Sequence, residues 1–263
     1  MDFKEHRILG RTGLKVSRLG LSGGYGVPTV AVEKAYREHN INFFYWGSRR
    51  TSEMKKALLN LIPSEREKMV ITLQSYDHLG PFTKRSVENG LRSLKIDYAD
   101  ILILGWHNWN PGNRILDKVR QLKEQGKIKH VAMSGHNRKF FGKMVQDPSF
   151  PVDIFMIRYN AEHPGAEQDI FPHLPKKDRP GIQTYTATSW GRLLKLKKTP
   201  PDETPMTAPE CYRFVLSNPN VDICMMGPRD EKEMDESLAA LDQGPLSKDE
   251  MKRVRKIGDY MHK

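Results

Sequence analysis

The sequence has few cysteines and no long apolar run. Cys211 and Cys224 are its two cysteines, and neither belongs to a CxxC motif or to a Cys/His spacing suited to zinc. We therefore expect no disulfide framework and no metal site, and two small, buried apolar thiols. No apolar run reaches about 18 residues, and the start "MDFKEHRILG" lacks the apolar core of a signal peptide. These absences predict a cytoplasmic protein without a membrane segment.

Acidic residues are outnumbered, which leaves a net charge of +11 and a pI near 9.5. Such a charge suits nucleic acid, a membrane surface or a phosphorylated small molecule. The densest basic run, residues 248–256, is interrupted by acids, which is typical of the solvated face of a helix. Nucleic-acid binding has no support in the sequence other than this net charge. We therefore expect a small-molecule ligand and no nucleic-acid partner. No pattern specifies an oligomeric state.

Short apolar runs alternate along the chain with longer amphipathic segments, which favours repeated βα units. The predicted strands are 17–23, 42–46, 69–75, 100–106, 130–136, 153–160, 181–188 and 222–228. The predicted helices are 30–40, 52–62, 83–95, 115–127, 138–147, 166–174, 208–218 and 231–241. This alternation predicts an α/β fold, a (β/α)8 TIM barrel, in which residues 1–263 form a single domain.

In such a barrel, residues at the carboxyl ends of the strands line one rim, where active sites lie. These residues are Tyr25, Tyr45, Trp46, Gln74, Trp106, His107, Ser134, His136, Arg158, Asn160, Tyr185, Gly227 and Arg229. They are polar, aromatic and cationic, without the paired carboxylates of a glycosidase or a recognisable Ser-His-Asp spacing. The rim therefore predicts an anionic ligand.

Several segments resemble the aldo-keto reductase family in their order and spacing. They are "RILGRTGLKVSRLGLSGGYG" from residue 7, "INFF" from 41, "SLKIDYADILIL" from 93, "QGKIKHVAMSG" from 125 and "MGPRDEKEMDESLAAL" from 226. The resemblance covers nearly the whole chain. It implies the same barrel, and hydride transfer between a nicotinamide cofactor and a carbonyl compound.

The catalytic residues implied by the resemblance are replaced in this chain. Tyr45 stands where the family has its aspartate, and Arg50 where it has the proton-donating tyrosine. Gln74 takes the place of the lysine and Gly105 that of the histidine. All four usual catalytic identities are therefore absent.

The cofactor residues depart less from the family pattern. By resemblance, Ser134 binds the nicotinamide carboxamide and Tyr185 stacks on the nicotinamide ring. The loop "SWGRLL", which contains Trp190, Gly191 and Arg192, resembles the segment that passes the pyrophosphate. The adenosine half would be held by Gly227, Arg229, Glu233 and Glu236. An arginine at position 229 suits a 2′-phosphate, so the resemblance implies NADP(H).

A rebuilt proton donor must lie within hydrogen-bond reach of the carbonyl and have a tunable pKa. We expect Tyr45 to be this donor, because Arg49 or Arg50 beside it would favour the phenolate. Arg50 joins the predicted catalytic set, and His107 would be a second acid or would orient the carbonyl. The alternatives are rim packing for Tyr45 and a solvent-facing loop position for His107.

Trp46, Trp106 and Arg158 are the predicted substrate residues, with Arg158 binding a carboxylate or phosphate. Ion pairing with Glu162, Glu167 or Asp77 is the structural alternative for the rim arginines. Two functions follow. The chain is an atypical oxidoreductase that uses NADP(H) and a small anionic carbonyl compound, or it is a non-catalytic barrel that keeps a ligand site as a sensor or partner subunit. The arginine, tyrosine and histidine residues at the rim favour the oxidoreductase, because a chain that had only lost its activity would have no need of them.

Overall fold

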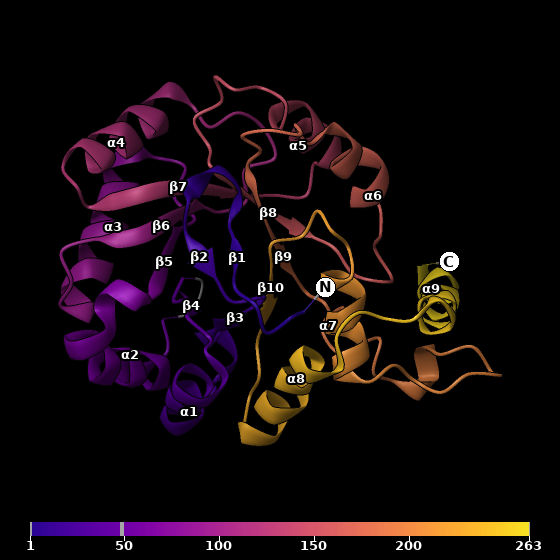
Figure 1. Cartoon of the computed structure of the whole chain (residues 1–263). Coiled ribbons are helices and arrows are strands. Elements are labelled where there is room, and N and C mark those ends of the chain that lie inside the picture. Colours follow the sequence, from indigo (N-terminus) through magenta and orange to yellow (C-terminus); the bar gives the residue numbers. More distant parts are fainter. Residues whose placement is uncertain (1, 48–49, 263) are drawn as a thin grey trace.

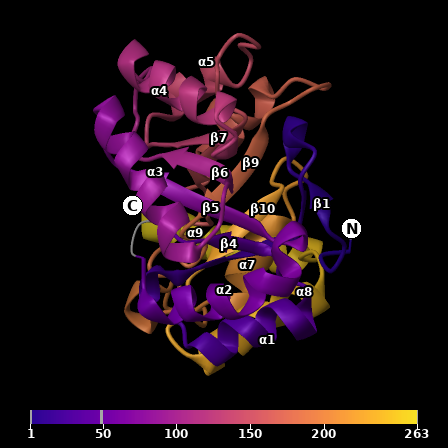
Figure 2. The ribbon, with the colours of Figure 1, turned by 90° about the vertical axis from the view of Figure 1, so that its left-hand side faces the viewer.

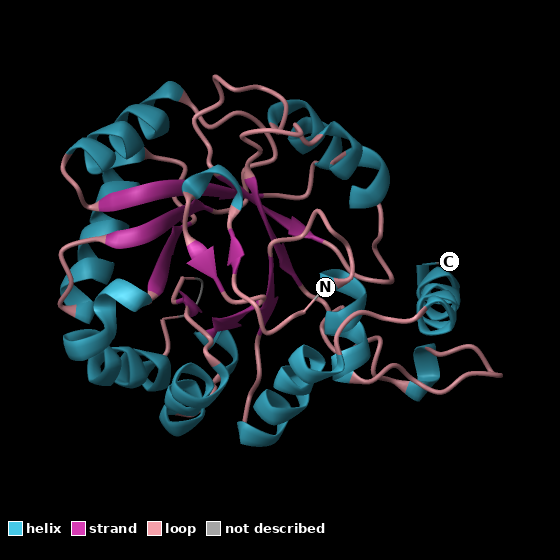
Figure 3. Cartoon of the chain, in the orientation of Figure 1, coloured by secondary structure: helices cyan, strands magenta, loops and turns pink. Residues whose placement is uncertain are grey.

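Eight parallel strands close into a barrel surrounded by helices (Figures 1 and 3). The computed structural model describes residues 2–47 and 50–262, so Arg49 lies outside the described residues. The barrel strands are β3 (Leu19–Ser22), β4 (Phe43–Tyr45), β5 (Val70–Ser75), β6 (Ala99–Leu104), β7 (Ile128–Ser134), β8 (Ile154–Arg158), β9 (Gly181–Tyr185) and β10 (Ile223–Met226). Their spatial order, β10-β3-β4-β5-β6-β7-β8-β9, confirms the predicted TIM barrel.

The helices follow the predicted order along the chain. They are α1 (Thr29–His39), α2 (Ser52–Glu65), α3 (Gly80–Leu94), α4 (Asn113–Glu124), α5 (Arg138–Met144), α6 (Ala166–Asp169), α7 (Ala208–Leu216), α8 (Glu231–Gln243) and α9 (Lys248–His262). The predicted helix 166–174 is wrong in one respect, because it breaks into α6 and a 3₁₀ turn, Phe171–His173. Pro172 lacks a backbone N–H and disfavours helical geometry before it, which explains the break.

Side chains at two helix starts explain why α7 and α8 begin where they do. Thr207 and Glu210 form a capping box, in which the Thr207 amide donates to Glu210 Oε2 at 2.7 Å. Asp230 caps α8, since its Oδ1 accepts from the Glu233 amide at 2.8 Å. The α8 cap also fixes the backbone that carries Arg229.

An antiparallel hairpin of β1 (Arg7–Ile8) and β2 (Lys15–Val16) lies across the amino-terminal end of the barrel (Figures 1 and 2). Asp222, whose side chain is fully buried before β10, pairs with the Arg7 guanidinium at 3.1 Å. Arg179 also donates to this carboxylate, at 2.9 Å to Oδ2, and so does the Ile182 amide. One buried acid therefore joins the hairpin to the starts of two strands.

The buried side chains form two clusters, separated by the barrel wall. The inner cluster contains alternate strand residues such as Phe43, Tyr45 and Met156, together with Leu9 and Val16 of the hairpin. The larger cluster lies between the barrel and the helices and holds the intervening strand residues. Strand side chains alternate between the two faces, so most barrel strands contribute to both clusters, whereas β3 supplies Leu19 and Leu21 to the outer cluster alone.

Cys211 and Cys224 are both buried free thiols, as predicted. Among the helices of the described chain, none is long and apolar enough to cross a membrane.

Removing the charge of Asp222 should destabilise the fold strongly. Asp222→Asn leaves two arginines without their buried partner, so we expect the free energy of unfolding to fall by about 3–5 kcal/mol. Asp235→Asn is the matched control, because Asp235 pairs with Lys34 at 2.9 Å on the surface. That variant should change stability by less than about 1 kcal/mol. Equal effects in urea unfolding would contradict the assignment.

Candidate active site

The carboxyl ends of the barrel strands bring the predicted rim residues to one mouth. Tyr45, Ser134, Arg158 and Tyr185 each end a strand, and Gln74 is the penultimate residue of β5. Gly105 and Gly227 directly follow β6 and β10. Because all eight strands are parallel, these positions share the same end of the barrel.

Tyr45 lies on the inner face of the wall and is 6% exposed. Its ring folds over Gly47, where a Cβ atom would overlap the ring and lie 2.8 Å from Gln74 Cβ. Tyr45 and Gln74 therefore lie side by side at the mouth, with a glycine beneath them.

Trp46 and Arg50 lie elsewhere than expected, which corrects two predictions. Trp46 is 2% exposed in the outer cluster, because its neighbour Tyr45 takes the inward position. The Arg50 guanidinium lies over the Trp46 ring and donates to the Ser86 carbonyl at 3.1 Å on α3. Arg50 is thus placed in the helical layer, and the geometry does not support its pairing with Tyr45.

Gln74 and Gly105, where the family resemblance implies a lysine and a histidine, fit closely against one another. A Cβ atom at Gly105 would overlap Gln74 Nε2 and lie 2.6 Å from the Tyr76 ring. Gln74 is 4% exposed, and its Oε1 is buried without a hydrogen-bond partner. The amide therefore occupies space that a histidine at 105 would need. Sequence comparison located Gln74 as a replaced residue but gave it no role.

His107 is buried rather than solvent-facing, with 5% of its surface exposed. Its ring packs against His78 at a centroid distance of 4.5 Å, and its Nε2 is buried without a partner. Burial, helped by His78, lowers the pKa of His107 from 6.5 to about 4. At neutral pH the His107 imidazole is therefore uncharged. In this state it can orient a substrate group by hydrogen bonding but does not act as a cationic general acid.

Trp106 and Ser134 are joined through the backbone of the loop after β6. The Trp106 amide donates to Ser134 Oγ at 3.4 Å, and the His107 amide to the Ser134 carbonyl at 2.8 Å. Trp106 has a positive φ of 59° and is 66% exposed, with its ring edge-on to Tyr76. An exposed indole in a strained backbone conformation at the mouth is typical of a ligand-contacting residue.

Arg158 and Tyr185 are neighbours across the β8–β9 pair. The Tyr185 hydroxyl lies 3.2 Å from His136 Nδ1. Burial raises the pKa of Tyr185 to about 12, and the charge of Arg158 opposes this rise. Burial and Arg158 both lower the pKa of His136. A small hollow of about 10 Å³, the room for one water molecule, is lined by Arg158 and His136.

Arg192, in the loop after β9, is held by Glu162, which follows β8. Its guanidinium pairs with Glu162 Oε1 at 2.7 Å, and Ser189 donates to the same carboxylate. Glu162 is 2% exposed, so the contact anchors the loop that carries Trp190 and Gly191. Trp190 itself is 55% exposed and has a φ of 55°. Ion pairing with Glu162 was the structural alternative for the rim arginines, and Glu162 pairs with Arg192.

The segment around Arg229 is also internally paired. The Arg229 Nε donates to Glu233 Oε1 at 2.9 Å, and the guanidinium is 72% exposed. Glu236 lies 4.0 Å from Lys232 on the surface of α8. Gly227 is covered by the Tyr25 ring, which leaves no room for a side chain there. A phosphate at Arg229 would therefore displace the partly exposed Glu233 carboxylate.

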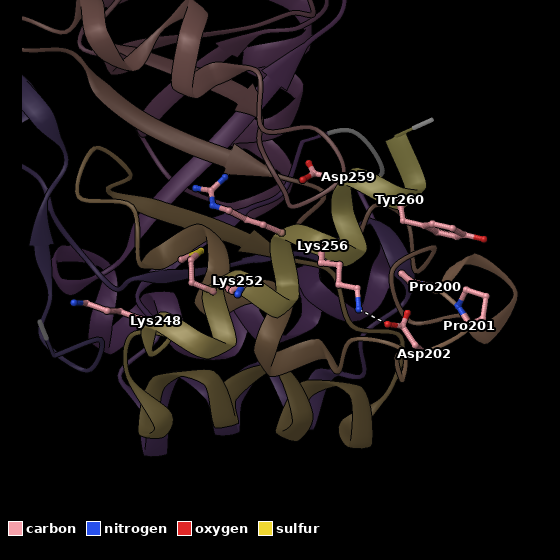
Figure 4. A pocket seen from close by; sticks show the side chains of 10 residues that line it. Pro200, Pro201, Asp202, Lys248, Lys252, Lys256, Asp259 and Tyr260 are labelled. Atoms are coloured by element: carbon pink, nitrogen blue, oxygen red, sulfur yellow. Dashed lines mark hydrogen bonds and ion pairs between the residues drawn. The ribbon is translucent and has the colours of Figure 1, made fainter.

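A larger hollow, about 800 Å³, lies away from these residues, along α9 (Figure 4). Pro200, Pro201 and Asp202 face α9 there, and Lys256 pairs with Asp202 at 2.5 Å. None of the predicted site residues lines it.

The closed parallel barrel with a polar, aromatic mouth defines a protein of the TIM-barrel class. Within it, the chain belongs to the aldo/keto reductase family, whose sequence model matches residues 30–211, more than half of the chain. The chain is 22% identical to the L-galactose dehydrogenase of Arabidopsis thaliana, over 90% of this chain and 88% of that protein. The family and this relative support an oxidoreductase.

Solved structures of an aldo-keto reductase from Bacillus halodurans share the fold. The apo form has a TM-score of 0.78 at 16% identity, covering 96% of this chain and 95% of that chain. The holo form has a TM-score of 0.77 at 16% identity and covers 96% of each chain.

The buried neutral state of His107 should make stability depend on pH. Its pKa is about 4 in the folded chain and near 6.5 when unfolded, so acid favours the unfolded state. Stability attributable to His107 is complete above pH 6.5 and is lost as pH falls toward 4, by up to about 3 kcal/mol. His107→Asn should flatten the fall in melting temperature over this window. An identical pH profile for the variant would show that His107 does not cause it.

Proposed function

We propose that the protein is an NADP(H)-dependent oxidoreductase that acts on a small anionic carbonyl compound with a rebuilt proton donor. The family membership supports the reaction class. The fine details rest on the chain's own rim residues, since the usual catalytic identities are replaced.

The environment of Arg158 is the observation that supports an anionic substrate. It is half-buried at the end of β8, and none of the acids in residues 2–47 and 50–262 forms an ion pair with it. Glu162 and Glu167, which the ion-pair alternative would have placed on Arg158, instead bind Arg192 and Arg255 at 2.7 and 2.8 Å. A partly desolvated guanidinium without a counter-charge favours a carboxylate or phosphate. Arg158 therefore anchors the substrate, with Trp106 beside the mouth.

The cofactor would lie across the mouth toward α8. Ser134 and Tyr185 are at the strand ends where the nicotinamide would bind, and Trp190 and Gly191 belong to the loop that would pass the pyrophosphate. When bound, the cofactor supplies the hydride. The 2′-phosphate would take Arg229 from Glu233, an exposed pair that costs little to separate.

Tyr45 is the proposed proton donor, because its ring is at the mouth on the inner face of the wall. Arg50 contacts α3, so any tuning of this phenol comes from other groups. If the chain binds NADPH but oxidises no NADPH with any carbonyl compound of a test panel, the alternative of a non-catalytic ligand-binding barrel replaces this proposal.

Arg229→Ala should discriminate between the two nicotinamide cofactors. Loss of a charge-assisted phosphate contact costs about 1.5–3 kcal/mol, or roughly ten-fold to a hundred-fold in NADPH affinity. NADH lacks this phosphate, so its affinity should change little. Fluorescence titration with both cofactors measures the difference, and Lys232→Ala, an exposed neighbour, is the control. Equal losses for NADPH and NADH would reject the 2′-phosphate assignment.

Tyr45→Phe should lower carbonyl reduction by about two to four powers of ten, the range for a positioned general acid. The change removes one oxygen and keeps the ring, so NADPH affinity should remain. Tyr25→Phe makes the same chemical change at a 52% exposed rim tyrosine and should keep activity. NADPH oxidation with a panel of carboxylated carbonyl compounds is the assay. Full activity in Tyr45→Phe would place the donor elsewhere.

A further inference from the structure

We propose that the Gln74 amide binds hydroxyl groups of the substrate, so that the substrate class is a hydroxylated, anionic carbonyl compound. This inference rests on the proposed function and adds a specificity-determining residue to it. Strand β5 places the amide at the mouth, because Gln74 follows Thr72 by two residues on the inward face of the strand.

The contacts of Gln74 place its amide within the mouth. Val70 of β5 belongs to the inner cluster, whereas Ile71 and Leu73 belong to the outer one, so Gln74 points inward. Gln74 Cβ and the Tyr45 ring both border Gly47, and Gln74 Nε2 and the Tyr76 ring both border Gly105. Gln74 thus shares these glycine neighbours with the proposed proton donor and with Tyr76.

The hydrogen-bonding state of Gln74 indicates a missing partner. The side chain is 4% exposed, and Oε1 has no hydrogen-bond partner. A buried acceptor without a partner costs about 1–3 kcal/mol, which a ligand hydroxyl group would remove. Tyr76, which is 40% exposed, borders Gly105 together with the Gln74 amide.

The chemistry of an amide explains which ligand group it recognises. A neutral amide offers a donor at Nε2 and an acceptor at Oε1, which pairs with hydroxyl groups and needs no charge. Arg158 supplies the cation for the carboxylate or phosphate of the same ligand. A site built to bind hydroxyl groups rejects analogues that lack them, because its polar atoms then stay unpaired.

Gln183 is a matched control within the same barrel. Its amide is fully buried, and both its polar atoms lack partners, like Gln74 Oε1, so its position along the strand is what distinguishes it from Gln74. Gln183 precedes Tyr185 by two residues on the same face of β9, so it lies further from the mouth than the end of that strand. Gln74→Leu and Gln183→Leu thus make the same chemical change at the mouth and below it.

The experiment compares the binding of gluconate and hexanoate, carboxylates of equal chain length with and without hydroxyl groups. Binding is followed by tryptophan fluorescence, with and without saturating NADP⁺. We expect the unaltered protein to prefer gluconate by about ten-fold or more, the worth of a hydrogen bond. Gln74→Leu should abolish this preference, Gln183→Leu should keep it, and Arg158→Met should weaken both ligands.

Three results would overturn the inference: no binding of gluconate, equal binding of both carboxylates, or a preference that survives Gln74→Leu. Melting temperatures check that the variants are folded, and Gln74→Met replaces Gln74→Leu if the latter is not. NADPH titration is a separate readout. Failure of NADPH binding would count against the proposed function while the carboxylate preference still decides the role of Gln74.

Discussion

The closed parallel barrel forces successive strand residues to opposite faces of its wall, and the site depends on this alternation. In β4 it directs Tyr45 inward and Trp46 outward, so adjacent aromatic residues have unrelated environments. The same rule turns Gln74 and Arg158 toward the mouth. The strand direction then brings residues more than a hundred positions apart to one rim.

The replaced catalytic positions are fitted to one another as a group. The Gln74 side chain fills space above Gly105, and Tyr45 fills space above Gly47. A histidine at position 105 would collide with the amide, so restoring one family residue alone would disturb the others. Close packing makes such substitutions interdependent. The inner mouth is thus built from a phenol and an amide in place of the family's charged groups.

The excess positive charge is not concentrated at the mouth. Arg192 and Arg229 are engaged by Glu162 and Glu233. Arg7 of the hairpin and Arg179 are engaged by Asp222. Arg158 differs, because Glu162 and Glu167, two of its possible ion-pair partners, pair with Arg192 and Arg255. The local pairing of charges, as well as the net charge of +11, therefore shapes the electrostatic field at the mouth.

The sequence by itself determined the order of strands and helices, because hydrophobic periodicity and turn residues are local signals. It also determined which residues end the strands, and with them most of the rim. Tertiary structure alone decided that Arg50 contacts Ser86, that His107 is buried against His78, and that Glu162 takes Arg192. These contacts join residues from different loops, and a side chain's direction beyond a strand end depends on packing that no local pattern specifies.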